Sequence, residues 1–443
     1  MRLMWLRRFN ELIIRSVTSE KDKEEIEMKK WLRRILKGLG ILVGVLVVLV
    51  IGLVVYVQLT WDRPVSRAVP QMTAPTDAQT VARGEYLYEY SNLCWMCHGS
   101  QGSHSPEEPQ AGGLEFDATE IGPGFGFFYG SNLTPDPETG IGTWSDGELV
   151  RAIREGLDRE GHLIFPVMPY EFAHGLSDED ALALVAYMRS LPPVRNKVPA
   201  NRTSFAYKAL IGLGMVKPQP AITAPVVAPP RGTTAEYGKY LAWHASGCAE
   251  CHMPRSPNTG ASDMTRPFAG GLFPFPEEGF STTGSNLTPD MATGIGDWTE
   301  EQFMTAMRTG LRPDGTVMLP FMPWPSYARW SEEDLRAAWL YLRSLEPIAH
   351  EVPASTLTGA AATGTGAARG EALFGVYCLV CHGEKGTGGP LTAVALKDAA
   401  QGMDDATLAT FIAEGLPGTS MPGFGKTLTD EQIADLVAFI RSW

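Results

Sequence analysis

The longest apolar stretch of the chain lies near its N-terminus, from Gly38 to Trp61, and contains 24 residues without a charged side chain. A helix rising about 1.5 Å per residue crosses the roughly 30 Å hydrocarbon core of a bilayer at this length. Basic residues directly precede the stretch, whereas only Arg63 and Arg67 closely follow it. The pattern predicts a transmembrane anchor over 38–61, a basic cytoplasmic extension over 1–37, and all later residues on the periplasmic or extracytoplasmic side.

A cleaved signal peptide is the alternative interpretation of this region, because it also joins basic residues to an apolar core. The apolar stretch is longer than the roughly 7–15 residues of a signal core, and no small-x-small cleavage site closes it clearly. An uncleaved, single-pass anchor is therefore preferred.

Beyond the anchor, apolar positions recur in three similar helical segments that follow a capped, acidic start. The three starts are at Ser177, Ser331 and Thr429, and the segments read ALVAYMRSL, AAWLYLRSL and ADLVAFIRSW. A glycine at Gly84, Gly238 or Gly370 lies on the first predicted helix of each unit. Glycine permits a second backbone to approach closely, so we expect the first and last helices to pack together, with Tyr187, Tyr341 and Phe439 as aromatic neighbours.

A long internal repeat sets the domain organisation. The sequence SNLTPDPETGIGTW at 131–144 recurs as SNLTPDMATGIGDW at 285–298, an offset of 154 residues. This indicates a tandem duplication, followed by a shorter third unit without the SNLTPD loop. That loop has two interpretations, as a wall of a cofactor crevice or as turn structure. The predicted units span 79–200, 230–352 and 368–443.

Two linkers are predicted between the units. Residues 201–229 run from AYKALIGLGM into a proline-rich segment that should be extended and semi-rigid, whereas residues 353–367 should be flexible. The segment AYKALIGLGM is interpreted as a structural connector in preference to a short surface or membrane-contacting helix.

Composition and charge narrow the function. Hydrophobic residues make up 44% of the 443-residue chain, and its 47 Gly and 33 Pro argue against long regular sheets. Residues 1–40 hold 11 Lys and Arg against 6 Asp and Glu, a balance of +5. The formal net charge of the whole chain is −13, so the other 403 residues carry −18. An acidic body argues against nucleic acid as a partner and favours a partner with a basic docking surface.

The six cysteines form three pairs of equal spacing, and each pair is followed at once by histidine, giving CWMCH, CAECH and CLVCH. Two thiols in this spacing can form thioethers with haem vinyl groups, while the histidine binds the iron. Zinc binding and dithiol redox chemistry are weaker alternatives, since neither requires three histidines at a fixed position. We predict three covalent haem c groups on Cys94, Cys97, Cys248, Cys251, Cys378 and Cys381, with His98, His252 and His382 as proximal ligands.

A methionine followed by proline precedes the last helix of each unit, at Met168, Met322 and Met421. A methionine sulfur that fills the sixth coordination position makes a haem an electron carrier rather than a site for small substrates. Threefold recurrence favours these ligands over the core-filling role that is usual for a methionine. Met318 is the main competitor for Met322, but its equivalent position holds Ile164. The remaining histidines, which are His104, His162, His174, His244 and His350, are not repeated at the offset of 154.

Three CxxCH motifs, two of them combined with SNLTPD and a later MPY or MPW, resemble the cytochrome c subunit of membrane-bound alcohol, gluconate, sorbitol and fructose dehydrogenases. The resemblance covers roughly residues 79–443. It implies a mainly α fold of three tandem class I cytochrome c domains, and the histidine and methionine ligands named above. It also implies electron transfer from a quinoprotein or flavoprotein partner to ubiquinone.

Three functions follow as hypotheses. The leading one is an electron-transfer subunit of a membrane-bound dehydrogenase, with no catalysis of its own. The second is a relay between a quinol-oxidising complex and a terminal oxidase or photosynthetic centre. The third is a haem enzyme, such as a peroxidase or thiosulfate dehydrogenase, which would need an open iron site. No acid/base pair, phosphate-binding loop or substrate pocket is recognisable in the sequence, so no catalytic residue is assigned.

Overall fold

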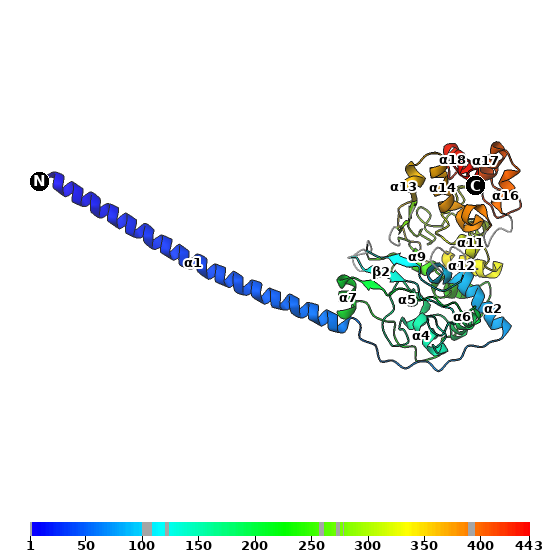
Figure 1. Ribbon diagram of the computed structural model, residues 1–443, viewed down its shortest axis with the longest axis horizontal. Coiled ribbons are helices and arrows are strands. Elements are labelled where there is room, and N and C mark those ends of the chain that lie inside the picture. The colour runs from blue at the N-terminus through cyan, green and yellow to red at the C-terminus, as the bar shows by residue number, and fades with distance from the viewer. Residues whose placement is uncertain are drawn as a thin grey trace. The chain divides into compact units, whose positions relative to one another are not determined.

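The computed structural model describes residues 2–99, 109–119, 124–256, 261–271, 275–277, 279–388 and 395–443. The chain forms two compact units (Figure 1). Residues 1–63 and 208–215 make up the anchor unit, and residues 64–207 and 216–443 make up the main unit. Each is described by itself below.

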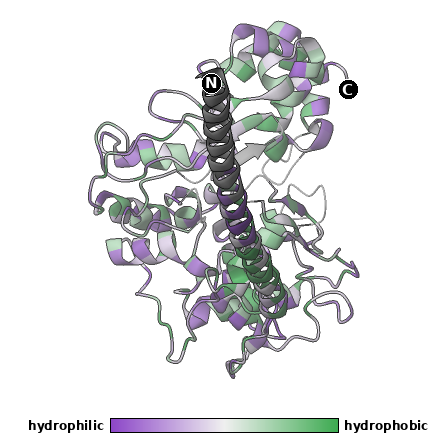
Figure 2. Cartoon of the chain, turned by 90° about the vertical axis from the view of Figure 1, so that its left-hand side faces the viewer, coloured by the Kyte–Doolittle hydropathy of each residue, from purple (hydrophilic) through white to green (hydrophobic). Residues whose placement is uncertain are grey.

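The anchor unit consists mostly of one long helix, α1 (Arg2–Thr60). Its part from Glu27 to Thr60 is long and apolar enough to cross a membrane. The apolar side chains of this part are almost all exposed. In Figure 2 this part of α1 is purple where its basic residues lie and green in the turns that follow them. Lys208 to Gly212, the second half of helix α7 (Phe205–Gly212), lie beside the C-terminal end of α1 (Figure 1).

The main unit begins with the first repeat, which is mainly helical with three short strands. Its helices before the strands are α2 (Ala78–Glu85), the π-helix η1 (Tyr86–Ser91) and α3 (Trp95–His98). Its strands are β1 (Glu115–Asp117), β2 (Gly126–Tyr129) and β3 (Arg202–Thr203). Its later helices are α4 (Asp146–Glu155), α5 (Tyr170–Ala173) and α6 (Asp178–Ser190).

The second repeat has the same order of elements, and most of them start 154 residues after their counterparts. Its helices are α8 (Ala235–Trp243), α9 (Cys248–His252), α10 (Glu300–Thr309), α11 (Trp324–Tyr327) and α12 (Glu332–Arg343). Its strands are β4 (Phe275–Glu277), β5 (Phe280–Thr282) and β6 (Thr356–Leu357). In each repeat the strands form an antiparallel sheet whose third strand comes from the segment after the last helix, with Gly126 opposite Thr203 and Phe280 opposite Leu357.

All the regular elements of the C-terminal region, in its described residues, are helices. Its elements are α13 (Gly359–Thr363), α14 (Gly366–Tyr377), α15 (Leu379–His382), the 3₁₀-helix η2 (Glu384–Gly386), α16 (Leu396–Gln401), α17 (Asp405–Glu414) and α18 (Asp430–Ile440).

The first and last helices of each repeat cross at glycine, as the sequence predicts. The Cβ of an alanine at Gly84 would lie 1.9 Å from the carbonyl oxygen of Ala183. Gly238 and Gly370 meet carbonyl oxygens of α12 and α18 in the same way, at 1.8 and 2.0 Å. These contacts hold α2 against α6, α8 against α12 and α14 against α18. The predicted caps are also present, because the hydroxyls of Ser177 and Ser331 accept from backbone amides of α6 and α12.

The two repeats share one hydrophobic core. It contains Leu87 and Leu184 from the first repeat together with Leu241 and Leu335 from the second. A second core joins the C-terminal helices to Val317 and Leu319, which belong to the second repeat.

Ordered elements lie within both predicted linkers. Strand β6 and helix α13 lie within residues 353–367, where a flexible segment was expected, and β3 and α7 lie within 201–229. Pairing of β6 with β5 satisfies backbone groups that a free linker would leave to water. The Gly, Ala and Thr residues of this segment have small side chains, but its backbone is held in regular structure.

Candidate haem-binding site

A large cavity of about 2110 Å³ lies within the main unit and connects the first two CxxCH motifs. Small-molecule pockets usually measure about 300–1,000 Å³, so this cavity has room for more than one large cofactor. Eight of the twelve predicted site residues line it, namely Cys94, Cys97, His98, Met168, Cys248, Cys251, His252 and Met322. The duplication therefore places its two candidate sites next to each other rather than on separate surfaces.

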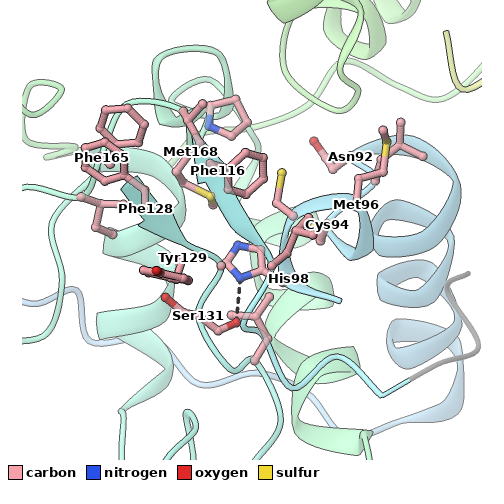
Figure 3. Close-up of a pocket in the computed structure, with 18 of the residues that line it drawn as sticks. Asn92, Cys94, Met96, His98, Phe116, Phe128, Tyr129, Ser131, Phe165 and Met168 are labelled. Carbon is pink, nitrogen blue, oxygen red and sulfur yellow. Dashed lines mark hydrogen bonds between the residues drawn. The ribbon is translucent and has the colours of Figure 1, made fainter. Parts of the chain in front are cut away.

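In the first repeat the motif lies on the short helix α3, with His98 as its last residue. His98 Nδ1 is hydrogen-bonded to the carbonyl oxygen of Ser131 at 2.9 Å, and this leaves Nε2 for a ligand. Figure 3 shows the His98 ring and the Met168 side chain extending into the same space, with Cys94 nearby. This is the arrangement that a haem with histidine and methionine ligands requires.

The second repeat reproduces the arrangement. His252 Nδ1 is hydrogen-bonded to the carbonyl oxygen of Ser285 at 2.7 Å. Met322 lines the cavity, whereas its competitor Met318 is absent from the lining, and the Met318 carbonyl oxygen accepts from Trp324 Nε1 at 3.4 Å. His252 and Met322, the pair that the repeat predicts, thus line the same cavity.

The third set of candidate residues lies in the C-terminal region. Cys378 precedes α15, and Cys381 and His382 lie at its end. Met421 lies in the loop between α17 and α18, where its carbonyl oxygen accepts from the amide of Leu416 at 3.3 Å. Burial lowers the pKa of His382, as it does for His98 and His252, and this favours the neutral form of each imidazole, which is the form that can bind iron.

The thiols are partly buried, and their pKa values are raised. Burial raises the pKa of four cysteines to about 12, and these are Cys94, Cys97, Cys251 and Cys378. Burial also raises the pKa of Cys248, and it raises that of Cys381 to about 11. Reactive dithiol sites have depressed thiol pKa values and electropositive surroundings, so this environment argues against dithiol redox chemistry. Among the described residues, no cluster of three or more His, Cys, Asp or Glu side chains could hold a metal ion.

The SNLTPD loop serves both roles that the sequence left open. Its Asn132 side chain donates from Nδ2 to the Val194 carbonyl oxygen at 2.8 Å and accepts from the Thr134 amide at 3.0 Å, so it forms a turn. Asn286 makes the equivalent bonds in the second repeat. Ser131, Asn132, Leu133 and Trp144 also line the cavity, so in the first repeat the same loop is part of its wall.

Sequence reasoning did not single out several residues that shape the cavity. Gly130 leaves so little space that a Cβ there would lie 1.8 Å from the Cys97 carbonyl oxygen, and Gly284 has the same relation to Cys251 at 1.9 Å. Tyr327 is buried against the second motif and lines the cavity. The recurrence of Gly130 and Gly284 at the offset of 154 was a usable signal, whereas Tyr327 corresponds to Ala173 and gave none.

An aromatic group closes the cavity beside Met168. Phe128 stacks on Phe165 with ring centroids 3.4 Å apart, and Tyr207 packs edge-on against both. Such packing gives the methionine side of the site an apolar, aromatic wall.

The remaining described histidines have structural partners and do not line the cavity. Backbone carbonyl oxygens are hydrogen-bonded to the Nδ1 atoms of His174, His244 and His350. His162 lies 3.6 Å from Asp158, and His104 is outside the described residues.

Polar contacts between the repeats are themselves duplicated. The Tyr86 hydroxyl donates to Asp334 Oδ2 at 2.6 Å, across the boundary between the repeats. The equivalent hydroxyl of Tyr240 donates to Asp180 Oδ2 at 2.7 Å. Because each contact is the 154-residue counterpart of the other, the two repeats pack with approximate twofold symmetry. This packing is what brings the two CxxCH motifs to one cavity.

Comparison with known proteins supports this view of the site. Residues 81–192 match the family model "Cytochrome c", and residues 365–440 match the model "Cytochrome C oxidase, cbb3-type, subunit III".

Three relatives match most of this chain. The gluconate 2-dehydrogenase cytochrome c subunit of Pantoea cypripedii is 32% identical over 82% of this chain and 85% of its own length. The alcohol dehydrogenase (quinone) cytochrome c subunit of Gluconobacter oxydans is 31% identical, over 82% of this chain and 78% of the relative. A nicotinate dehydrogenase subunit of Pseudomonas putida is 29% identical over 86% of this chain, which spans only 32% of that protein.

Proposed function

Because this chain belongs to the cytochrome c subunits of membrane-bound dehydrogenases, we propose that it carries three haem c groups and passes electrons from a dehydrogenase partner to the next carrier. In this proposal the main unit lies on the periplasmic or extracytoplasmic side, where haem c is attached. Ubiquinone is the candidate acceptor.

The observation that carries the proposal is the shared cavity, whose wall holds two cysteines, a histidine and a methionine from each of the two repeats. Bound haem c would supply an iron centre that gains and loses one electron. The axial pairs proposed are His98 with Met168, His252 with Met322, and His382 with Met421. Thioethers would form at the two cysteines that precede each of these histidines.

The protein's own residues would prepare these sites. Carbonyl oxygens of Ser131 and Ser285 hold the imidazole rings of His98 and His252 in one orientation. Aromatic side chains form an apolar wall beside Met168, and a filled coordination sphere would leave no position for a small substrate. These features favour electron transfer over catalysis.

The test is spectroscopic. The purified full chain should bind three haems per polypeptide by the pyridine haemochrome assay, with the corresponding gain in mass. The oxidised protein should be low-spin and show a methionine-to-iron band in the near infrared. A high-spin haem that readily binds carbon monoxide would contradict the ligand assignment at that site and favour the haem-enzyme alternative.

A second candidate function rests on the match of residues 365–440 to an oxidase subunit model. Under that alternative the chain would relay electrons from a quinol-oxidising complex to a terminal oxidase or photosynthetic centre. Affinity purification of the intact membrane complex separates the two, because co-purification of a dehydrogenase subunit supports the first function and co-purification of oxidase subunits supports the second.

A further inference from the structure

We propose that residues 208–215, which follow the third strand of the first repeat, form a second membrane contact that lies in the outer-leaflet interface beside the end of α1. The occupant of this surface is lipid, at the boundary between acyl chains and headgroups. This contact involves only the anchor unit, so it does not depend on the number of haems or on their ligands.

The segment 208–215 contacts the anchor helix α1 directly. Thr60 Oγ1 lies 3.3 Å from the carbonyl oxygen of Gly212. A Cβ on Gly212 would lie 2.9 Å from Thr60 Oγ1 and 3.4 Å from the Cα of Val57, so the two backbones are close. Val57 is also the one buried side chain among those described in α1. The segment therefore packs on the last turn of the anchor.

The position of the segment relative to the membrane follows from where the apolar stretch of α1 ends. The apolar stretch 38–61 ends at Trp61, and Asp62 and Arg63 follow. At about 1.5 Å per residue its 24 residues span about 36 Å, slightly more than the roughly 30 Å hydrocarbon core. Its last turn therefore lies at the interface, which is the level that tryptophan prefers. Whatever packs on Val57 and Thr60 must lie at the same level.

The exposed surface of the segment is largely apolar and carries one lysine. Leu213 and Met215 are 49% and 59% exposed, so they present apolar side chains at that level. Lys208 lies with its ammonium 4.7 Å from the centroid of the Trp61 ring. An apolar surface with a lysine that can extend toward headgroups, next to an interfacial tryptophan, is what an interfacial element requires.

The duplication supplies an internal comparison. In the second repeat, helix α13 starts at Gly359, the counterpart of Phe205, and packs against α14. The counterpart of Lys208 is Ala362, and the equivalence ends before Leu213, because residues from Gly366 onward form α14. The fold of the repeat therefore does not itself require the lysine at 208, which is specific to the copy whose connector meets the anchor.

Photolabelling from within the bilayer tests the proposal. The full haem-loaded chain is reconstituted in phosphatidylethanolamine–phosphatidylglycerol vesicles that contain a lipid with a diazirine in its acyl chain. After illumination, mass spectrometry should find lipid adducts on the peptide with Leu213 and Met215 as well as on residues 38–61. Adducts confined to the anchor, or a cross-link from this peptide to a co-purifying protein in place of lipid, would overturn the proposal.

Two paired variants make the test specific. The double substitution L213S/M215S should abolish the adducts on this segment while the anchor stays labelled and haem content is unchanged. The control M264S/M291S alters two methionines that are 48% and 70% exposed on the main unit, and it should leave the pattern unchanged. Adducts on the peptides with Met264 and Met291 as strong as those at Leu213 would show unspecific labelling and would also overturn the proposal.

Discussion

Met168 and Met322 occupy equivalent places on the cavity wall, although nothing about an isolated methionine distinguishes a ligand from a core residue. We expect M168A and M322A each to remove about one third of the methionine-to-iron absorption, because each would leave two of three haems intact. Each should also lower the potential of the affected haem, since the thioether favours reduced iron. Near-infrared spectra combined with redox titration provide the measurement.

M318A is the matched control for this experiment, because Met318 is the nearby methionine that does not line the cavity. It should keep the full absorption. An M318A protein that loses the band while M322A retains it would reassign the second ligand.

The pair formed by Tyr86 and Asp334 is the residue-scale test of the contact between repeats. Y86F removes the hydroxyl that donates to Asp334 at 2.6 Å in a partly buried position. A hydrogen bond to a charged group contributes about 1.5–3 kcal/mol, so the free energy of unfolding should fall by that amount in urea denaturation. Y129F is the control, because the Tyr129 hydroxyl bonds Glu115 at an exposed position and its loss should cost under about 1 kcal/mol.

Single residues also show where sequence reasoning stops. The CxxCH motifs and the repeated methionines were visible because their spacing carries the chemistry. Tyr86 and Asp334 are 248 positions apart, and no local pattern predicts that they meet. Their contact depends on how two repeats pack, which is a property of the folded surface and not of either repeat alone.

At the scale of elements, the crossing of α14 and α18 depends on one glycine. The Cβ introduced by G370A would lie 2.0 Å from the Asp435 carbonyl oxygen, so the helices must separate. We expect a loss of about 2–4 kcal/mol in unfolding free energy, in line with overpacking of a core. Thermal unfolding followed by circular dichroism gives the measurement.

G375A is a control on the same helix. A Cβ at Gly375 would meet nothing within 4 Å, so replacement there should stabilise α14 by about 0.5–1 kcal/mol through its better helix propensity. Equal losses for G370A and G375A would indicate that the effect of G370A does not come from the helix crossing.

The element scale also separates what could be predicted from what could not. Helix starts at Ser177, Ser331 and Thr429 were predictable because capping is local chemistry. Strand β6 was not, because Thr356 and Leu357 become a strand only by pairing with Phe280 and Ser281, more than seventy residues earlier. Composition alone therefore made residues 353–367 resemble a flexible linker.

At the scale of the whole molecule, the net charge determines the long-range electrostatic attraction or repulsion of a partner. The 403 residues after Gly40 carry a formal net charge of −18, given −13 for the chain and +5 for residues 1–40. Long-range attraction should therefore speed encounters with cationic reagents and slow encounters with anionic ones. This expectation does not depend on which dehydrogenase supplies the electrons.

Two small inorganic redox reagents of opposite charge test it on the full chain in detergent. Raising the ionic strength from about 0.01 M to 0.1 M shortens the Debye length from about 30 Å to about 10 Å and screens most of the long-range field. The rate constant for electron exchange with hexaammineruthenium, a cation, should fall over this range by up to about tenfold, and that with hexacyanoferrate, an anion, should rise. Stopped-flow measurement of haem absorbance gives both values. If both reagents respond in the same direction, the electron-exchanging edges lie where the net charge is not felt, and docking by a basic partner surface loses its support.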